Sequence, residues 1–241
     1  MELSEKIKQF NNNRYGAYPT LPTEAHFFTD KVYLYKALRE LIKIAAGRKL
    51  RVLEIGCADG SFLRTLEQNN FEAVGIDIAE DAIARARAAS LDAQVCNTEN
   101  EIAFPDNEFD AVIACEIIEH LYDTDFFLKE IKRVLKPKGT VIISTPNLAS
   151  LKNRFRLLFG LYPRYSEYRL GDDTSGHIRN YTPCVLKKQL IANGFSVSNI
   201  FAPNILFPMT RTIPVFIKKI AIRLGDIFYK TGSHIIIVGK K

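Results

Sequence analysis

Apolar residues recur along this chain in two alternating patterns. Residues 51–57 and 73–78 form short runs rich in Val, Ile, Leu and Ala, which are typical of strands buried on both faces. Residues 61–69 and 80–89 instead carry apolar side chains three and four positions apart, the period of an amphipathic helix. A further helical pattern at residues 29–46 precedes them. This order predicts an α/β fold with a parallel sheet and helices on both of its faces.

The same alternation continues through the middle of the chain. Further strands are predicted at residues 93–97, 109–115 and 140–146, with a helix at residues 125–135 between the last two. After them the rhythm breaks. Residues 149–182 are aromatic and basic and follow no clean period, so we interpret them as a long insertion.

The C-terminal part begins with a well-marked helix. Thr182 can cap this helix, Pro183 suits its first turn, and Gly194 ends it. Two strands follow, at residues 195–202 and 234–241. Coming after five parallel strands, they predict an antiparallel hairpin that closes the edge of the sheet.

The connection between these last two strands is unusually long, and it includes the basic amphipathic stretch of residues 214–228. We favour the interpretation of this stretch as a helical lid that covers a ligand pocket. The alternative is a surface for peripheral contact with a membrane or with a partner.

The totals indicate a single domain of 241 residues, made of a helical cap (1–47), a core (48–148), the insertion, and a C-terminal helix and hairpin (183–241). Lysine and arginine exceed aspartate and glutamate by 33 to 27, which permits an anionic partner such as nucleic acid but does not indicate one. The four cysteines lie far apart and form no CxxC pair, so we expect a reduced, cytoplasmic protein. Because no signal peptide and no apolar run of membrane-spanning length is present, we also expect it to be soluble.

A glycine-containing turn joins the first predicted strand to the helix after it. Gly56 and Gly60 let the backbone approach a ligand at the start of that helix. A dinucleotide-binding turn would also need glycine at positions 58 and 61, where the chain has alanine and serine, so pyrophosphate binding is disfavoured. Glu54 lies just before the turn, and Asp77 ends the next strand. These two carboxylates fit a ligand with a cationic amino-acid end and a ribose diol.

Four segments together resemble the successive motifs of class I S-adenosylmethionine-dependent methyltransferases. They are LEIGCADGSF, GIDIA, NEFDAVIACEIIEHL and LKPKGTVIISTPN, which occur in this order over residues 48–148. The resemblance implies a Rossmann-like fold whose mostly parallel, seven-stranded sheet ends in an antiparallel hairpin. It also implies S-adenosylmethionine as the cofactor.

The resemblance assigns cofactor-binding roles residue by residue. The glycines would adjoin the methionine part, the aspartate would bind both ribose hydroxyls, and the residue after it would lie against adenine. Where the family often has an aspartate beside the adenine amino group, this chain has an asparagine, whose amide oxygen can accept the same hydrogen bond. Alternatives are a helix-capping role for Asp77 and simple packing for Cys115. The family's middle glycine is Ala58, whose extra methyl group we expect to cost little. The matching positions are Glu54, Gly56, Gly60, Asp77, Ile78, Asn97, Thr98 and Cys115.

The stretch CEIIEH, residues 115–120, contains the candidate catalytic and metal-binding residues. If residues 116–121 are helical, Glu116, Glu119 and His120 share one face, where they could bind Mg²⁺ or another divalent ion that lowers the pKa of a hydroxyl. The pattern is similar to one that binds a divalent ion in ubiquinone-biosynthesis O-methyltransferases and in small-RNA 3′-end 2′-O-methyltransferases. The RNA enzymes add a later histidine, for which His177 is the candidate. The alternatives are a metal-free pocket lining and a purely structural helix start.

We therefore expect an S-adenosylmethionine-dependent O-methyltransferase that acts on a hydroxyl of a small molecule or a glycan, with His120 and His177 as catalytic residues. Residues after position 145 resemble methyltransferases encoded with surface-polysaccharide enzymes. Alternatives are a metal-dependent quinone-type phenol methyltransferase, an RNA 2′-O-methyltransferase and a non-catalytic module that binds the cofactor. Nucleic acid is the less favoured partner but is not excluded, and the sequence specifies no oligomeric state.

Overall fold

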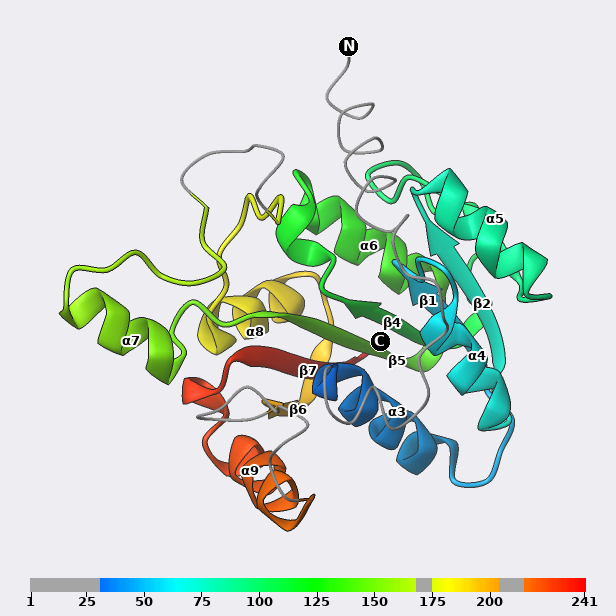
Figure 1. The fold of residues 1–241 in the computed structure, drawn as a ribbon. Coiled ribbons are helices and arrows are strands. Elements are labelled where there is room, and N and C mark those ends of the chain that lie inside the picture. The colour runs from blue at the N-terminus through cyan, green and yellow to red at the C-terminus, as the bar shows by residue number, and fades with distance from the viewer. Residues whose placement is uncertain (1–30, 168–174, 204–214) are drawn as a thin grey trace.

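The computed structural model describes residues 31–167, 175–203 and 215–241. Its centre is a seven-stranded sheet with the order β3-β2-β1-β4-β5-β7-β6, flanked by helices on both faces (Figure 1). The first five strands in this order are parallel to one another, and β7 runs antiparallel to both of its neighbours. The strands are β1 (Arg51–Ile55), β2 (Glu72–Asp77), β3 (Ala93–Val95), β4 (Phe109–Cys115), β5 (Leu135–Pro146), β6 (Ser196–Phe201) and β7 (His234–Lys240).

The helices cover the two faces because each buries one apolar stripe against the sheet. One core cluster contains the apolar faces of the helices α3, α4 and α5, and the other contains those of α6 and α8. Successive residues of one strand enter opposite clusters, as Val52 and Leu53 do. The predicted layers and the C-terminal hairpin are confirmed. The five helices are α3 (Val32–Ala45), α4 (Ser61–Gln68), α5 (Glu80–Ala88), α6 (Thr124–Val134) and α8 (Pro183–Ala192).

The insertion contains a helix that the sequence pattern did not predict, α7 (Leu151–Leu158). Asn153 is its only buried residue, so no apolar face of this helix packs against the sheet. Its position depends on polar contacts instead. The Ser150 hydroxyl caps the helix, and the Asn153 side chain accepts a hydrogen bond from the backbone N–H of Arg164 and donates to its carbonyl. In Figure 1, α7 lies at the margin of the molecule, away from the sheet.

The long connection of the hairpin includes the helix α9 (Val215–Ile227). It lies beside β6, and its Ile222 packs on Val32 at the start of α3. The buried ammonium of Lys36 in α3 donates hydrogen bonds to the carbonyls of Ala202 and Ile222 and pairs with Asp226. Burial lowers the pKa of Lys36, and the Asp226 carboxylate opposes this shift. The predicted helix is present, and its function as a lid stays a prediction. No described helix has the length and apolar character needed to cross a bilayer.

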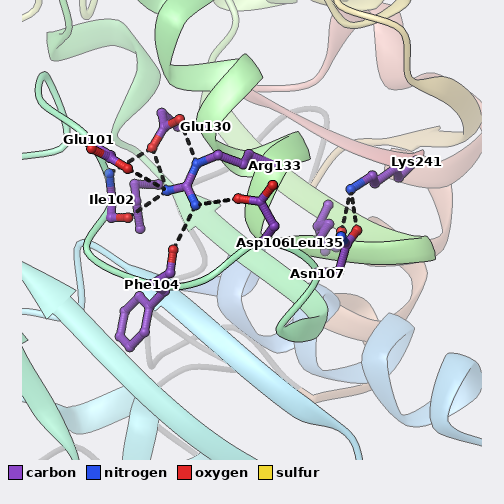
Figure 2. A network of polar contacts seen from close by, with 9 residues as sticks. All are labelled: Glu101, Ile102, Phe104, Asp106, Asn107, Glu130, Arg133, Leu135 and Lys241. Carbon is purple, nitrogen blue, oxygen red and sulfur yellow. Dashed lines mark hydrogen bonds and ion pairs between the residues drawn. The ribbon is translucent and has the colours of Figure 1, made fainter.

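An arginine on α6 fastens the segment that leads into β4 (Figure 2). The Arg133 guanidinium donates to the carbonyls of Ile102 and Phe104 and pairs with Glu130 and Asp106. These carboxylates raise the pKa of Arg133. Because the guanidinium satisfies two backbone carbonyls as well as two charges, it fixes the loop that positions β4 beside β1.

Candidate functional site

The carboxyl ends of the parallel strands meet at one edge of the sheet, where open α/β sheets bind ligands. At the end of β1 the glycine turn has positive φ at three positions, Gly56 (80°), Ala58 (47°) and Gly60 (78°). A Cβ atom on Gly56 would lie 2.2 Å from Cδ1 of Ile117, and one on Gly60 would lie 2.4 Å from Cδ1 of Leu91. Both positions therefore favour glycine, since any other residue would strain the backbone and displace the Ile117 or Leu91 side chain. Ala58 has a left-handed backbone, which is unfavourable for alanine. The small cost expected for its extra methyl group did not include this backbone strain.

Asp77, the last residue of β2, fastens this turn. Its Oδ2 accepts a hydrogen bond from the backbone N–H of Ala58, and its Oδ1 accepts one from Ala79, each at 2.9 Å. Burial raises the pKa of Asp77, while the backbone N–H groups of Ala79, Ala58 and Ile78 oppose this shift. The helix-capping alternative for Asp77 is wrong, because Ala79 is the N-cap of α5 and no side chain caps that helix. The carboxylate instead joins the glycine turn to the backbone N–H of Ala79. Each oxygen keeps a second lone pair that a ribose hydroxyl could use.

Glu54 is a buried carboxyl group of this edge whose pKa is strongly raised. Burial, which leaves 5% of the residue exposed, raises its pKa to about 8; Lys31 opposes the shift and Asp77 adds to it. Among the described residues, Oε2 of Glu54 has no hydrogen-bond donor. A buried acceptor of this kind is costly until a donor or a cation meets it. It is therefore suited to the ammonium group of an amino acid.

The remaining predicted cofactor residues lie along the same edge. Ile78 follows β2 and is half-buried. Asn97 lies two residues beyond β3, on a segment held to Asp77 by a hydrogen bond from Cys96, and its side chain accepts a hydrogen bond from the backbone N–H of Glu99. Thr98 lies between them and is half-buried. The Cys115 thiol packs against the apolar core, and burial raises its pKa, which agrees with the packing alternative for this residue.

The condition that residues 116–121 are helical, on which the shared face depended, is not met. Glu116 has a left-handed backbone with a φ of 59°, and only the short 3₁₀ turn η1 (Ile118–His120) follows it. The Glu116 side chain therefore does not share a face with Glu119 and His120. Its Oε1 accepts a hydrogen bond from the Ser144 hydroxyl at 2.6 Å, and its Oε2 lies 3.4 Å from Nε2 of His234.

The other three candidates converge. Ligand atoms of Glu119, His120 and His177 all lie within 4.8 Å of one another, and Nε2 of His177 is 3.9 Å from Oε1 of Glu119. The insertion brings His177 there because the backbone N–H groups of Ile178 and Arg179 donate to the carbonyl of Glu119. We call these three residues the Glu-His-His cluster.

Backbone carbonyls orient both imidazoles of this cluster. Nδ1 of His120 is 3.0 Å from the carbonyl oxygen of Gly176, and Nδ1 of His177 is 2.9 Å from that of Tyr165. A carbonyl oxygen only accepts hydrogen bonds, so the proton of each neutral ring is on Nδ1 and the lone pair is on Nε2. Such carbonyl contacts are the usual outer partners of histidines that bind metal ions. The cluster can therefore act as a base or hold a divalent ion.

Sequence reasoning missed His234, which was interpreted only as part of a strand. It begins β7 opposite Pro146, the last residue of β5, and therefore reaches the same edge as Glu116. The predicted hairpin could have identified His234 as a site residue, because a strand antiparallel to β5 begins where β5 ends. Tyr33 was also missed, and its ring lies 5.8 Å from that of His234, while the ring of Tyr165 lies 5.5 Å from it.

Comparison with known proteins agrees with this geometry. The family described as a methyltransferase domain matches residues 28–199. The chain belongs to this methyltransferase family. A crystal structure from Thermotoga maritima, described as a possible histamine N-methyltransferase, is similar over 99% of this chain and 100% of its own, with a TM-score of 0.70 and 20% identity. The resemblance to class I S-adenosylmethionine-dependent methyltransferases is thereby confirmed.

Relatives of this methyltransferase differ in what they do. A ubiquinone biosynthesis O-methyltransferase of Bradyrhizobium diazoefficiens is 36% identical over 103 residues, which cover 41% of this chain and 40% of that protein. The crystal structure of the [4+2]-cyclase SpnF is similar with a TM-score of 0.54 and 20% identity, over 86% of this chain and 82% of its own. The chain spans 40%, 49% and 60% of the lengths of three curated relatives it matches. Family membership therefore leaves the acceptor to be argued from the site.

The raised pKa of Glu54 predicts a specific pH dependence of stability. Between pH 4.5, the ordinary value, and about 8, the folded protein keeps a proton on Glu54 that the unfolded chain releases, so the free energy of unfolding falls as the pH rises. We expect Glu54→Gln to remove a slope of up to about 1.4 kcal/mol per pH unit in this window. Chemical denaturation across the window measures it.

Glu67→Gln, at an exposed position of α4, is the control and should leave the slope unchanged. An unchanged slope in Glu54→Gln would show instead that the Glu54 carboxyl titrates near its ordinary value.

Proposed function

We propose that this protein transfers a methyl group from S-adenosylmethionine to a hydroxyl oxygen of its substrate. The observation that carries this proposal is the arrangement of Glu54 and Asp77 on either side of a glycine turn, at the same edge of the sheet as the Glu-His-His cluster. The first pair matches a ligand with an ammonium group and a ribose diol. The cluster supplies the basic groups that a poorly nucleophilic hydroxyl needs.

When bound, S-adenosylmethionine supplies a methyl group on a positively charged sulfur. The residues of the chain have three tasks in this proposal. Glu54 binds the amino group, since its buried Oε2 lacks a donor. Asp77 binds the ribose hydroxyls through its remaining lone pairs. Residues at the ends of β4 and β5 align the acceptor oxygen for in-line attack.

Binding of S-adenosylhomocysteine tests the cofactor site. We expect Asp77→Ala to weaken binding at least about tenfold, since each hydrogen bond to a charged group is worth about 1.5–3 kcal/mol. Isothermal titration calorimetry measures the dissociation constants. The exposed Asp81→Ala in the first turn of α5 is the matched control and should bind as the unaltered protein does.

Because Asp77 also fastens the glycine turn, Asp77→Asn is measured beside it. This variant keeps one oxygen acceptor, and its melting temperature reports whether the fold is intact. Equal affinity in Asp77→Ala and the unaltered protein, or no binding by either, would contradict the cofactor assignment.

The Glu-His-His cluster fits a divalent ion. It combines a buried carboxylate with two imidazoles that are oriented by carbonyl groups and keep their lone pairs on Nε2. Such a mixed oxygen and nitrogen set suits Mn²⁺ or Zn²⁺ better than Mg²⁺, which prefers oxygen. We propose that this cluster, without Glu116, holds the ion. When bound, the ion would lower the pKa of the acceptor hydroxyl.

Metal analysis tests this proposal. We expect purified protein incubated with Mn²⁺ or Zn²⁺ to retain one ion per chain after gel filtration, because all three ligands are present. His177→Ala should lose the ion, whereas Glu116→Gln should retain it, since Glu116 faces Ser144 and His234. Plasma emission spectrometry gives the stoichiometry. No retained ion in the unaltered protein, or loss in Glu116→Gln, would count against the proposed ligand set.

The surface of α7 favours peripheral membrane contact. Phe155, Leu157, Leu158, Phe159 and Leu161 are each more than half exposed. Apolar side chains concentrated on one short helix and its C-terminal turn are unusual on a monomer surface. Residues 148–167 carry four basic side chains and one acidic side chain, a balance that suits anionic lipids. Beside the C-terminal end of α7 lies an open surface depression of about 500 Å³, lined partly by Leu148, Leu157 and Leu161.

On α9, Ile217, Ile220 and Ile227 are also exposed, so residues 214–228 remain a second candidate contact. We propose that α7 places the protein on an anionic membrane that carries its substrate. Co-sedimentation with vesicles of phosphatidylglycerol and phosphatidylcholine tests this.

We expect binding that weakens with salt and is lost in the double variant Leu158→Asp, Phe159→Asp. Both side chains are about three-quarters exposed, at 74% and 73%, so the fold should tolerate the change. The matched control is the double variant Lys187→Asp, Lys188→Asp on α8, which alters charge elsewhere on the surface. Equal sedimentation with and without vesicles would contradict the proposal, and salt-sensitive binding to RNA alone would favour a nucleic-acid substrate.

A further inference from the structure

Glu116 is the one member of the E-x-x-E-H pattern that faces away from the Glu-His-His cluster. Its left-handed backbone, with a φ of 59°, directs the side chain toward β5 and β7. The backbone N–H of Glu116 donates to the Ser144 carbonyl at 2.9 Å, and the Ser144 hydroxyl donates to Oε1 at 2.6 Å. A left-handed backbone is unfavourable for a residue with a side chain, so the contacts of Glu116 must hold this conformation.

His234 faces the other carboxylate oxygen. Its Nε2 lies 3.4 Å from Oε2 of Glu116, and its Nδ1 lies 3.0 Å from the Ser233 hydroxyl. The Ser144 hydroxyl therefore holds one oxygen of the Glu116 carboxylate by a hydrogen bond, and the His234 ring lies within ion-pairing distance of the other. Because the Glu116 side chain is 21% exposed, a small ligand can still reach it.

Aromatic rings surround this pair. Tyr33 from α3 and Tyr165 from the insertion lie 5.8 Å and 5.5 Å from the His234 ring, measured between ring centroids. The Tyr165 ring is also 6.3 Å from that of His177, so it connects the pair with the Glu-His-His cluster. Rings at these distances pack against one another, so they form a continuous aromatic wall beside Glu116, on which a planar ligand can lie.

The turn after β4 places Glu116 between the cofactor side and this aromatic wall. Cys115 ends β4, and Ile117 lies over Gly56 of the glycine turn. Glu116, between them in sequence, instead contacts Ser144 and His234. A carboxylate at this boundary can accept the proton of an un-ionised hydroxyl, because the acceptor oxygen meets the methyl group there.

We propose that Glu116 takes the proton of an aromatic hydroxyl during methyl transfer, and that His234 and Ser144 position its carboxylate. The inference rests on the proposed methyl transfer and names its acceptor class. The hydroxyl oxygen forms a bond to the methyl carbon as the carbon–sulfur bond breaks. Sulfur keeps that electron pair, and S-adenosylhomocysteine leaves as a neutral thioether. The hydroxyl proton moves to Oε2 of Glu116.

The test compares two acceptors of different acidity, catechol and 4-nitrocatechol, with the full chain and saturating S-adenosylmethionine. 4-Nitrocatechol is already ionised in mildly alkaline buffer, so its methylation needs no base. We expect Glu116→Gln to lower kcat for catechol roughly 100-fold or more, as is usual for a lost general base, and kcat for 4-nitrocatechol less than about fivefold. Mass spectrometry quantifies the methylated products.

Glu67→Gln on α4 is the matched control and should change neither rate, because its side chain lies on the solvent side of that helix. Binding of S-adenosylhomocysteine by Glu116→Gln should equal that of the unaltered protein, which shows that the fold and the cofactor site are intact. An equal loss with both acceptors would show a structural role for Glu116 and would overturn the proposal.

His234 is a positioning residue in this proposal, so its variants need a separate outcome. His234→Gln keeps an N–H donor for Glu116 and should retain most of the catechol activity. His234→Ala should lower kcat at least about tenfold, with KM changed less than about threefold. Equal activity of the two variants would remove His234 from the site.

The failures of the two proposals are distinguishable. If the unaltered protein does not bind S-adenosylhomocysteine, the methyltransferase proposal fails. If it binds S-adenosylhomocysteine but methylates neither acceptor, the aromatic acceptor and with it the role of Glu116 are overturned, while the cofactor site stands.

Discussion

The parallel pairing of β1 with β2 on one side and with β4 on the other determines where the residues of the cofactor side of the site lie. Glu54 pairs with Gly75 and Ile113 in this register, so Gly56, Asp77 and Cys115 all fall at the carboxyl edge. The strands are buried on both faces, so polar groups are tolerated mainly where the strands end. Pairing β7 antiparallel to β5 adds His234 to the same edge. Strand order therefore fixes the position of the site, whichever side chains carry out the catalysis.

Much of the fold could be predicted because burial leaves a period in the sequence. The helices α4, α5 and α6 place apolar residues against the sheet, and Thr182 caps α8 as its sequence indicated. The helix α7 could not be found in this way, since Asn153 is its only buried residue and its stability comes from polar contacts with a distant loop. Strand β5 begins at Leu135, earlier than predicted. It does so because Leu135 pairs with Phe109 across an irregularity that only the neighbouring strand imposes.

At the cofactor-binding edge, too, some features could be predicted from the sequence and others could not. Glu54, Gly56 and Asp77 were recognisable because a strand, a tight turn and a second strand fix their relation over a short stretch of chain. The structure adds that Asp77 already serves two backbone N–H groups, so the carboxylate is oriented before any ligand arrives. It also adds that the alanine at position 58 has a left-handed backbone, which a substitution pattern cannot reveal. Preorganisation of this kind lowers the entropy cost of binding, while the protein bears the cost of strain and of buried charge.

The prediction that Glu116, Glu119 and His120 share one face depended on a helical backbone, which the sequence alone could not establish. Residues three and four apart share a face only if the intervening backbone is helical, and one left-handed residue at Glu116 removes that relation. Long-range contacts then decide the partners: the insertion brings His177 to Glu119, and the hairpin brings His234 to Glu116. A single pattern of charged residues therefore becomes two adjacent groups with different neighbours. The first has the imidazole lone pairs that suit an ion, and the second has a carboxylate, held by a serine hydroxyl, that suits a proton. Relatives that share the E-x-x-E-H spacing can use its first glutamate in the same way only if they share this backbone turn and a histidine at the start of the last strand.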